Sequence, residues 1–128
     1  MIRLQGKGVS TGVATGPLYF YRRGGGDIVR HEIADVAAEL ERFEAARLSA
    51  IDQLKALYDK ALAEVGEESA QLFEAHQLML DDLDYIESIQ GMINDKVNAE
   101  AAVSDTAGIF ADMFANMDDA YMQARAAD

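Results

Sequence analysis

The stretch Gly66-Glu-Glu-Ser-Ala-Gln-Leu-Phe-Glu-Ala-His-Gln-Leu-Met-Leu-Asp-Asp-Leu-Asp84 decides the fold of this chain. It contains no proline, and no glycine after its first residue. Its apolar residues recur at spacings of three and four, which is typical of an amphipathic helix with one buried face. The stretch therefore predicts a helix, and the segments on both sides of it continue the same pattern.

A helical projection divides this stretch into two neighbouring arcs. One arc carries apolar residues and the only histidine of the helical region: Leu72, His76, Met79, Leu83 and Ile86. The other mixes polar and apolar residues: Glu67, Gln71, Glu74, Ala75, Leu78 and Asp82. His76 at the edge of a core is most often a structural, hydrogen-bonded residue. Leu78 is either one ordinary exposed leucine or the apolar centre of a docking patch with an acidic rim, and the residues alone leave both interpretations open.

The segment before Gly66 has the same period over a greater length, which predicts a helix over residues 34–65. Its apolar stripe consists of Val36, Leu40, Phe43, Ala50, Leu54, Leu57 and Ala61. Arg47 interrupts the stripe and has to find a partner or extend to solvent. Such a helix needs neighbouring helices to be stable, and Gly66 is a suitable residue to end it.

The segments after Gly66 predict three more helical runs. These are residues 67–95 with a bend at Asp81-Asp82, residues 99–116 with Asn98 as N-cap, and a last helix opened by Asp118-Asp119 and reaching Ala127. The short breaks between the runs place successive helices antiparallel. The expected fold is mainly α: an antiparallel four-helix bundle with a long bent helical hairpin.

The first 33 residues have a different character. They hold most of the ten glycines and the only proline, and residues 2–4 and 17–21 read as short β-strands. The run Gly6-Lys-Gly-Val-Ser-Thr-Gly12 resembles a phosphate-binding loop only superficially. Lys7 is followed by Gly8 instead of Ser or Thr, so we interpret the run as a structural turn.

Composition excludes several classes of function. The chain has 128 residues, no cysteine and a net charge of −12, so neither nucleic acid nor an anionic membrane is expected as a partner. No signal peptide or transmembrane run is present, and we expect a cytoplasmic protein. Phe73 stands where a di-metal bundle would carry glutamate three residues before His76, so no metal site is expected. No serine is marked as a nucleophile, so we expect no catalytic residue and no cofactor-binding residue in this chain.

Three stretches together resemble the N-terminal part of Enzyme I, the phosphoenolpyruvate-protein phosphotransferase of the bacterial sugar phosphotransferase system. They are Gly12-Val-Ala-Thr-Gly16, the run from Gly66 to Asp82, and Asp118-Asp-Ala-Tyr-Met-Gln-Ala-Arg-Ala-Ala-Asp128. The first departs from the family pattern, because Thr11 stands where the family has proline. The resemblance covers the whole chain in order.

This resemblance implies two parts. Residues 1–21 would be the N-terminal strands of an incomplete α/β phosphohistidine domain. Residues 22–128 would be the helical domain that binds the phosphocarrier protein HPr. The family's phosphoacceptor histidine lies in a Thr-Ser-His context, which neither His31 nor His76 matches. We therefore expect a truncated piece of a larger enzyme that does not phosphorylate itself. Magnesium and dimerisation through a C-terminal domain would belong to the remainder of Enzyme I.

The resemblance also implies a docking surface for HPr. Carried over position by position, its residues are Glu67, Glu68, Gln71, Ala75, His76, Leu78, Asp82, Asp84 and Arg125. The partner carries basic residues around its own active histidine, which suits an acidic rim. His76 is then an interfacial or positioning residue and not the site of phosphorylation.

Two alternatives remain. One is the Enzyme I-like domain of a nitrogen-type phosphotransferase or of a dihydroxyacetone kinase system. The nitrogen type usually has a sensory domain ahead of this region, whereas Met1 here directly precedes the first expected strand, which favours the sugar type. The other alternative is a helical adaptor with no part in phosphoryl transfer.

Overall fold

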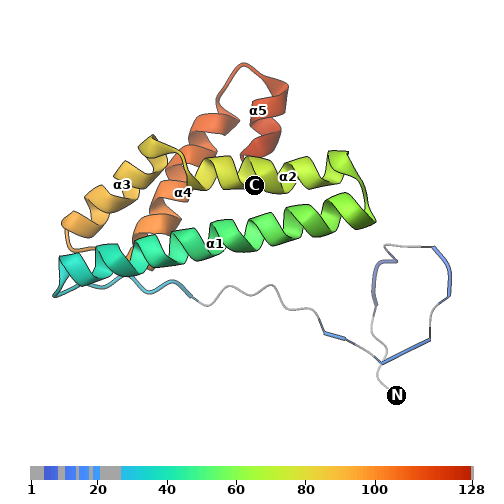
Figure 1. Cartoon of the computed structure of the whole chain (residues 1–128), viewed down its shortest axis with the longest axis horizontal. Helices are drawn as coiled ribbons and strands as arrows, with labels where there is room; N and C mark the ends of the chain where they lie inside the picture. The colour runs from blue at the N-terminus through green and yellow to red at the C-terminus, as the bar shows by residue number, and fades with distance from the viewer. Residues whose placement is uncertain (1–4, 9–10, 14, 18, 21–26, 128) are drawn as a thin grey trace.

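The computed structural model describes residues 5–8, 11–13, 15–17, 19–20 and 27–127. Its helices follow one another as α1 (Val36–Glu64), α2 (Glu67–Leu80), α3 (Leu83–Asn94), α4 (Ala99–Ala115) and α5 (Ala120–Arg125). Helix α1 packs against both α2 and α3, which lie nearly end to end along it, while α4 packs against α3 and α5 returns against α4 (Figure 1). When α2 and α3 are counted as one bent segment, this is the expected bundle with a long bent hairpin.

A side-chain cap and a glycine turn set the two ends of helix α1. Asp35 is its N-cap, and the carboxylate accepts a hydrogen bond from the Ala38 N–H at 3.0 Å. At the other end the chain turns at Gly66. Its φ of 111° is a backbone conformation that is strained for every residue except glycine. The Val65 and Gly66 N–H groups both donate to the Ala61 carbonyl, at 2.8 Å and 2.9 Å, and close the last turn of the helix.

The expected bend at Asp81-Asp82 is a complete break between α2 and α3. Asp82 is the N-cap of α3 and accepts a hydrogen bond from the Tyr85 N–H at 3.0 Å. The break restarts the helical phase, so a single projection drawn through it misplaces the residues of α3. Leu83, predicted to share the core-facing arc with His76, is 71 % exposed, and that prediction was wrong.

Arg47 holds the break against α1. Its side chain is 12 % exposed, and it donates to the Leu80 carbonyl at 2.9 Å and to the Asp81 carboxylate at 2.7 Å. It also pairs with Glu44 one turn earlier on α1. The charged residue that interrupts the apolar stripe is therefore paired, as its position required, and it satisfies a carbonyl at the end of α2.

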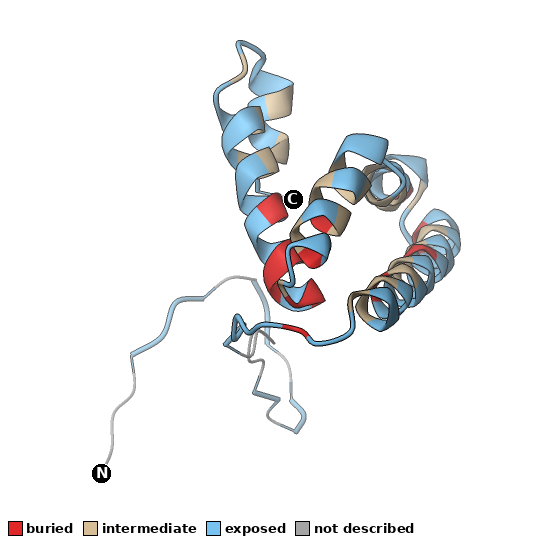
Figure 2. Cartoon of the chain, turned by 90° about the vertical axis from the view of Figure 1, so that its left-hand side faces the viewer, coloured by how far each residue is buried: buried red, intermediate tan, exposed pale blue. Residues whose placement is uncertain are grey.

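The core lies where α3, α4 and the N-terminal half of α1 meet (Figure 2). Its buried residues are Ile33, Phe43, Ile89, Ile93, Ala99 and Ala102. The small residues on α4 let that helix approach α3 closely. The far half of the hairpin is thinner, with Ile51, Ala61 and Ala70 as its buried residues. The rigid core thus lies at one end of the bundle, and more apolar surface is exposed at the other.

The start of α4 is capped by a residue from another helix. Asn98 occupies the predicted N-cap position, but its side chain makes no capping hydrogen bond. The carboxylate of Glu39 on α1 accepts the Ala99 N–H at 2.7 Å instead. Arg42 then bridges Glu39 and Glu100, with nitrogen–oxygen distances of 2.6 Å and 2.7 Å. This cluster adds polar contacts between α1 and α4 to those that the two helices make in the core.

Asn98 fixes the segment that precedes α1. Its side chain is 1 % exposed, accepts the His31 N–H at 3.0 Å and donates to the Val29 carbonyl at 3.2 Å. An isolated bridge pairs Glu32 with Val97, and it is the only β-pairing among the residues described. Residues 29–33 are therefore held against the α3–α4 connection.

The expected strands are not confirmed. Residues 2–4 lie outside the described part of the chain, and Pro17, Tyr19 and Phe20 form no strand. A strand needs a neighbour for its N–H and C=O groups, and the described residues offer none to this segment. The division into residues 1–21 and 22–128 remains a prediction.

The first prediction concerns the cap of α4. Replacing Glu39 by alanine leaves the Ala99 N–H without its acceptor and removes one partner of Arg42. We expect a loss of about 1–3 kcal/mol in the free energy of unfolding, measured by urea denaturation. Glu41→Ala, at an exposed position on the same helix, is the control and should change it by less than about 0.5 kcal/mol. Equal effects of the two substitutions would contradict the assigned role of Glu39.

The second prediction concerns pH. The hydrogen bond from Arg42 lowers the pKa of Glu39, aided by the Ala99 N–H, and Arg42 lowers the pKa of Glu100 from 4.5 to about 2. Because the folded-state pKa values lie below the unfolded ones, this stabilisation is complete above about pH 4.5 and is lost as the pH falls towards 2. In the Arg42→Met variant the free energy of unfolding should fall less steeply across that pH range. Circular dichroism measures the unfolding. The control is Lys55→Met, which removes the exposed ion pair with Asp52 and should leave the pH dependence of stability unchanged.

Candidate functional site

A pocket of about 440 Å³ opens between α2, the start of α3 and the α4–α5 pair. We call it the aromatic pocket. Its lining residues are Leu54, His76, Leu78, Met79, Leu80, Asp82, Tyr85, Ala107, Phe110, Ala111, Phe114, Arg125 and Ala126. The rings of Tyr85 and Phe110 meet edge to face with centroids 5.3 Å apart, and burial raises the pKa of Tyr85. The break at Asp82 positions Tyr85 here, because it starts the turn of α3 that carries the ring.

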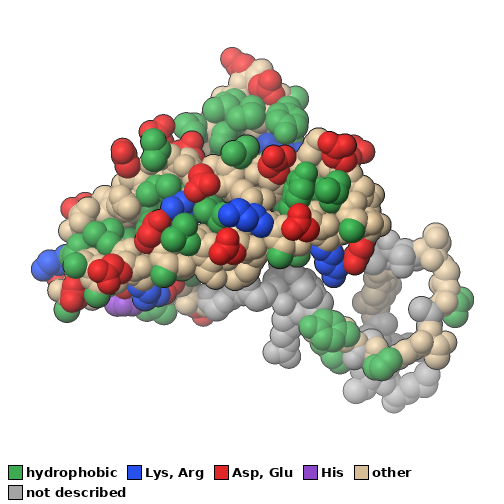
Figure 3. Space-filling view, viewed as in Figure 1, with side chains coloured by type: hydrophobic (Ala, Val, Ile, Leu, Met, Phe, Trp, Pro, Cys, Tyr) green, Lys and Arg blue, Asp and Glu red, His purple; other side chains and the backbone are tan. Residues whose placement is uncertain are grey.

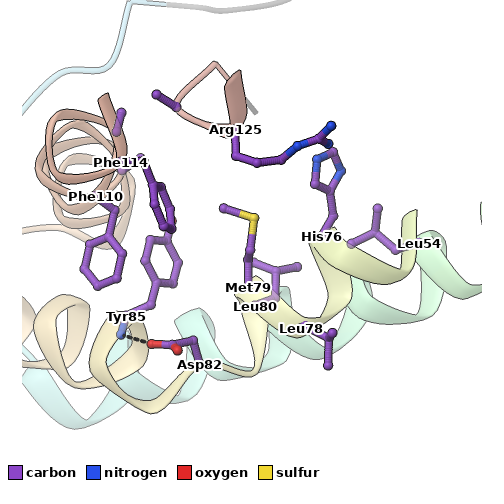
Figure 4. A pocket seen from close by; sticks show the side chains of 13 residues that line it. Leu54, His76, Leu78, Met79, Leu80, Asp82, Tyr85, Phe110, Phe114 and Arg125 are labelled. Atoms are coloured by element: carbon purple, nitrogen blue, oxygen red, sulfur yellow. Dashed lines mark hydrogen bonds between the residues drawn. The ribbon is translucent and has the colours of Figure 1, made fainter. Parts of the chain in front are cut away.

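His76 and Arg125 form the polar end of the aromatic pocket. Their side chains come from α2 and α5 and point toward one another (Figure 4). The His76 Nε2 atom is buried and has no hydrogen-bond partner among the described residues. The Arg125 guanidinium lies over the Tyr121 ring, 5.1 Å from its centroid. Most buried polar atoms in proteins have a hydrogen-bond partner, so this nitrogen is an exception among the described residues.

A second hollow, of about 740 Å³, lies between the last turns of α1, the first half of α2 and α5. We call it the tip groove. Its lining residues are Leu57, Lys60, Ala61, Glu64, Val65, Glu68, Ser69, Gln71, Leu72, Phe73, Ala75, Tyr121 and Arg125. Residues of α2 line both hollows, and the two adjoin at Arg125, which lines both.

The structure brings most of the predicted site residues to this stretch. Glu68, Gln71 and Ala75 line the tip groove; His76, Leu78 and Asp82 line the aromatic pocket; Arg125 lines both. Glu67 and Asp84 are exposed in the first turns of α2 and α3 but line neither hollow. Asp82 has a second task, since its carboxylate caps α3.

Two exposed leucines stand beside the acidic residues of α2 and α3. Leu78 is 69 % exposed and Leu83 is 71 % exposed, and Asp81, Asp82 and Asp84 lie around them in the sequence. On the face seen in Figure 3, acidic and hydrophobic side chains are interspersed over the helices. This surface joins apolar area to negative charge, as an interface for a basic protein would.

Sequence reasoning missed part of this surface. Leu83 was assigned to the core side, and Tyr85 and Phe114 were not singled out. The Asp81-Asp82 pair was the available signal, because a new N-cap restarts the helical phase for every later residue. Placing Phe114 beside Tyr85 requires the angle between α4 and α3, which no local pattern contains.

The described residues do not fit a metal centre. None of their His, Asp and Glu side chains form a group of three or more that could hold an ion. Magnesium remains a prediction for the parent enzyme. Within the described part of the chain, no helix has the length and apolar character needed to cross a membrane.

Known proteins match the chain over almost its whole length. Residues 5–125 match the family model described as "PEP-utilising enzyme, N-terminal". Phosphoenolpyruvate-protein phosphotransferases are similar to it, from Bacillus subtilis at 36 % identity over 100 % of this chain and from Lactococcus lactis subsp. lactis at 40 % over 98 %. The chain spans only 23 % and 22 % of those two relatives.

Solved structures show the same fold. The N-terminal domain of a nitrogen-type Enzyme I matches with a TM-score of 0.74 and 25 % identity, over 80 % of this chain and 43 % of that one. A solution structure of Enzyme I matches with a TM-score of 0.73 and 30 % identity, over 78 % and 42 % of the two chains. On the family match, the sequence relatives and the shared fold, this chain belongs to the family of N-terminal domains of phosphoenolpyruvate-utilising enzymes, in the form found in Enzyme I.

Proposed function

We propose that this chain docks the phosphocarrier HPr for phosphoryl transfer in sugar uptake. The observation that carries the proposal is the exposed Leu78 on α2, beside the aromatic pocket and among acidic residues. An apolar centre with a charged rim suits a partner that has a small apolar patch among basic residues. HPr, the partner implied by the family resemblance, presents such basic residues around its active histidine.

The mechanism is recruitment. The phosphohistidine that supplies the phosphoryl group would belong to the rest of the parent enzyme, because neither histidine of this chain has the Thr-Ser-His context. Docking on α2 and α3 would hold the histidine of HPr close to that donor, so that transfer gains from proximity and orientation. The carrier has to leave after each transfer, and a small, partly polar interface meets that need.

The packed core and its polar contacts would hold the helices of this surface in place. Arg47 ties the end of α2 to α1, and Glu39 ties α1 to the start of α4. Glu68 and Asp84 would attract the carrier over a distance, while Leu78 and Leu83 would contribute apolar contact. His76 and Arg125 would position the partner at the meeting point of the two hollows. We place the protein in the cytoplasm, where this transfer would occur.

The nitrogen phosphotransferase branch is the second candidate. It is favoured by the structural likeness to a nitrogen-type Enzyme I domain at 25 % identity. The relatives from Bacillus subtilis and Lactococcus lactis, at 36 % and 40 % identity, are named phosphoenolpyruvate-protein phosphotransferase. Titration with the carriers of both branches under the same conditions separates the two, since the true partner should bind more tightly.

The third prediction tests the acidic rim. Replacing Glu67 and Glu68 together by lysine should weaken binding of HPr by roughly tenfold or more at low salt, because attraction becomes repulsion. Raising the ionic strength should weaken binding to the unaltered chain and narrow this difference. Isothermal titration calorimetry measures both effects.

A matched control has the same change in charge elsewhere. Glu41 and Asp112 are exposed, lie on α1 and α4 and line neither hollow. Their replacement by lysine should lower affinity much less than the change at Glu67 and Glu68. Equal losses in the two double variants would mean that net charge, and not this rim, governs association.

The fourth prediction tests the apolar centre. Leu78→Ala should reduce affinity for HPr by about 1 kcal/mol or more, which is roughly fivefold. Its effect on the free energy of unfolding should stay within about 0.5 kcal/mol, since the side chain is largely exposed. Leu48→Ala, at an exposed position on α1 that lines neither hollow, should bind HPr as the unaltered chain does. Normal binding by the Leu78 variant would remove this residue from the interface.

A further inference from the structure

The polar end of the aromatic pocket contains an unexplained atom. His76 Nε2 is buried, and no described residue makes a hydrogen bond to it. A buried ring nitrogen left without a hydrogen-bond partner costs free energy. The atom lies at the end where Arg125 approaches from α5 (Figure 4). A ligand that enters the pocket and offers a hydrogen-bond acceptor here would satisfy the ring.

Apart from Asp82, the rest of the pocket is lined by apolar and aromatic residues. Tyr85 lies on one side, and Phe110 and Phe114 come from α4 (Figure 4). Aromatic rings favour edge-to-face or offset contact with another ring, as Tyr85 and Phe110 already show. The volume of about 440 Å³ lies within the range of pockets that hold small molecules, roughly 300–1,000 Å³.

Positive and negative charge lie at opposite ends of the pocket. The Arg125 guanidinium is at the His76 end, whereas Asp82 is at the end near Tyr85 (Figure 4). The Asp82 carboxylate already accepts the Tyr85 N–H. A ligand with its negative charge at the His76 end would therefore have its anion near a guanidinium and its apolar body among the rings, away from the Asp82 carboxylate.

We propose that the aromatic pocket binds a small aromatic carboxylate. The carboxylate accepts a hydrogen bond from His76 Nε2–H beside Arg125, and the ring packs against the aromatic side of the pocket, which Tyr85, Phe110 and Phe114 line. Leu78 and Asp82 line the same pocket, so a bound carboxylate and a docked HPr compete for one surface. This competition rests on the proposed function, whereas the ligand site itself does not.

The test uses 3-phenylpropionate as the probe and 3-phenylpropionamide as its neutral counterpart. Each is titrated into the isotope-labelled chain while amide and methyl shifts are recorded. We expect saturable shifts at residues lining the aromatic pocket, with the acid binding about tenfold more tightly than the amide. Equal affinities would overturn the assignment of an anionic ligand. The absence of saturable shifts at the pocket would overturn the site.

Two pairs of variants locate the binding. Ala111→Phe fills the pocket and should abolish binding of the acid, whereas Ala115→Phe, one turn further along α4 at an exposed position, should not. His76→Leu removes the donor and should weaken binding about tenfold. His76→Gln, which retains an N–H donor, should bind more tightly than the leucine variant. Equal affinities of the two His76 variants would exclude the ring nitrogen from the site.

A competition experiment separates this inference from the proposed function. When HPr is bound to the labelled chain, adding 3-phenylpropionate should displace HPr and raise the apparent Kd of HPr. If HPr binds but the acid does not, the ligand site is wrong and the docking proposal stands. If the acid binds at the pocket and HPr does not bind at all, the docking proposal is wrong and the ligand site stands. Simultaneous binding of both would exclude competition for one surface.

Discussion

The hydrogen bond from the Tyr85 N–H to the Asp82 carboxylate is the constraint on which the proposed docking surface depends. It ends the register of α2 and starts α3 at a new phase, so one long helical run becomes two shorter helices. As a result Leu83 is exposed, and the Tyr85 ring reaches Phe110 on α4. Arg47 on α1 stabilises the break, because its guanidinium donates hydrogen bonds to the Leu80 carbonyl and the Asp81 carboxylate. The aromatic pocket is a consequence of this break.

A second cluster keeps the other end of the bundle rigid. Glu39 accepts the first N–H of α4, and Arg42 holds Glu39 and Glu100 together, so an ion network caps a helix across the core. Asn98 is thereby freed from capping and instead fixes residues 29–33. The buried core and the proposed docking surface therefore lie in different parts of the molecule. Most buried residues gather where α3, α4 and the start of α1 meet, whereas Leu78, Leu83 and the two hollows lie along α2 and the start of α3.

Local chemistry predicted the helices well because their signals are local. Asp35, Gly66, Asp82 and Asp119 each mark a helix end through a side-chain hydrogen bond or a positive φ. The family resemblance selected α2 as the surface of interest, and the fold likeness is confirmed. Two features were beyond the sequence: the cap of α4 comes from Glu39, 60 positions away, and the pocket requires the packing angles of α4 and α5. Leu83 was misplaced because a single projection was drawn through a break that the aspartates already indicated.

The central claim is that α2 and the start of α3 form a docking surface for HPr. The most direct measurement is a titration of the isotope-labelled chain with unlabelled HPr, following amide shifts. We predict saturable shifts at sub-millimolar HPr that are concentrated on Glu68, Ala75, Leu78 and Leu83 and around Arg125, with the core near Ile89 and Ile93 unchanged. Shifts centred on the outer faces of α1 or α4, or no shift in α2 at those concentrations, would contradict the claim.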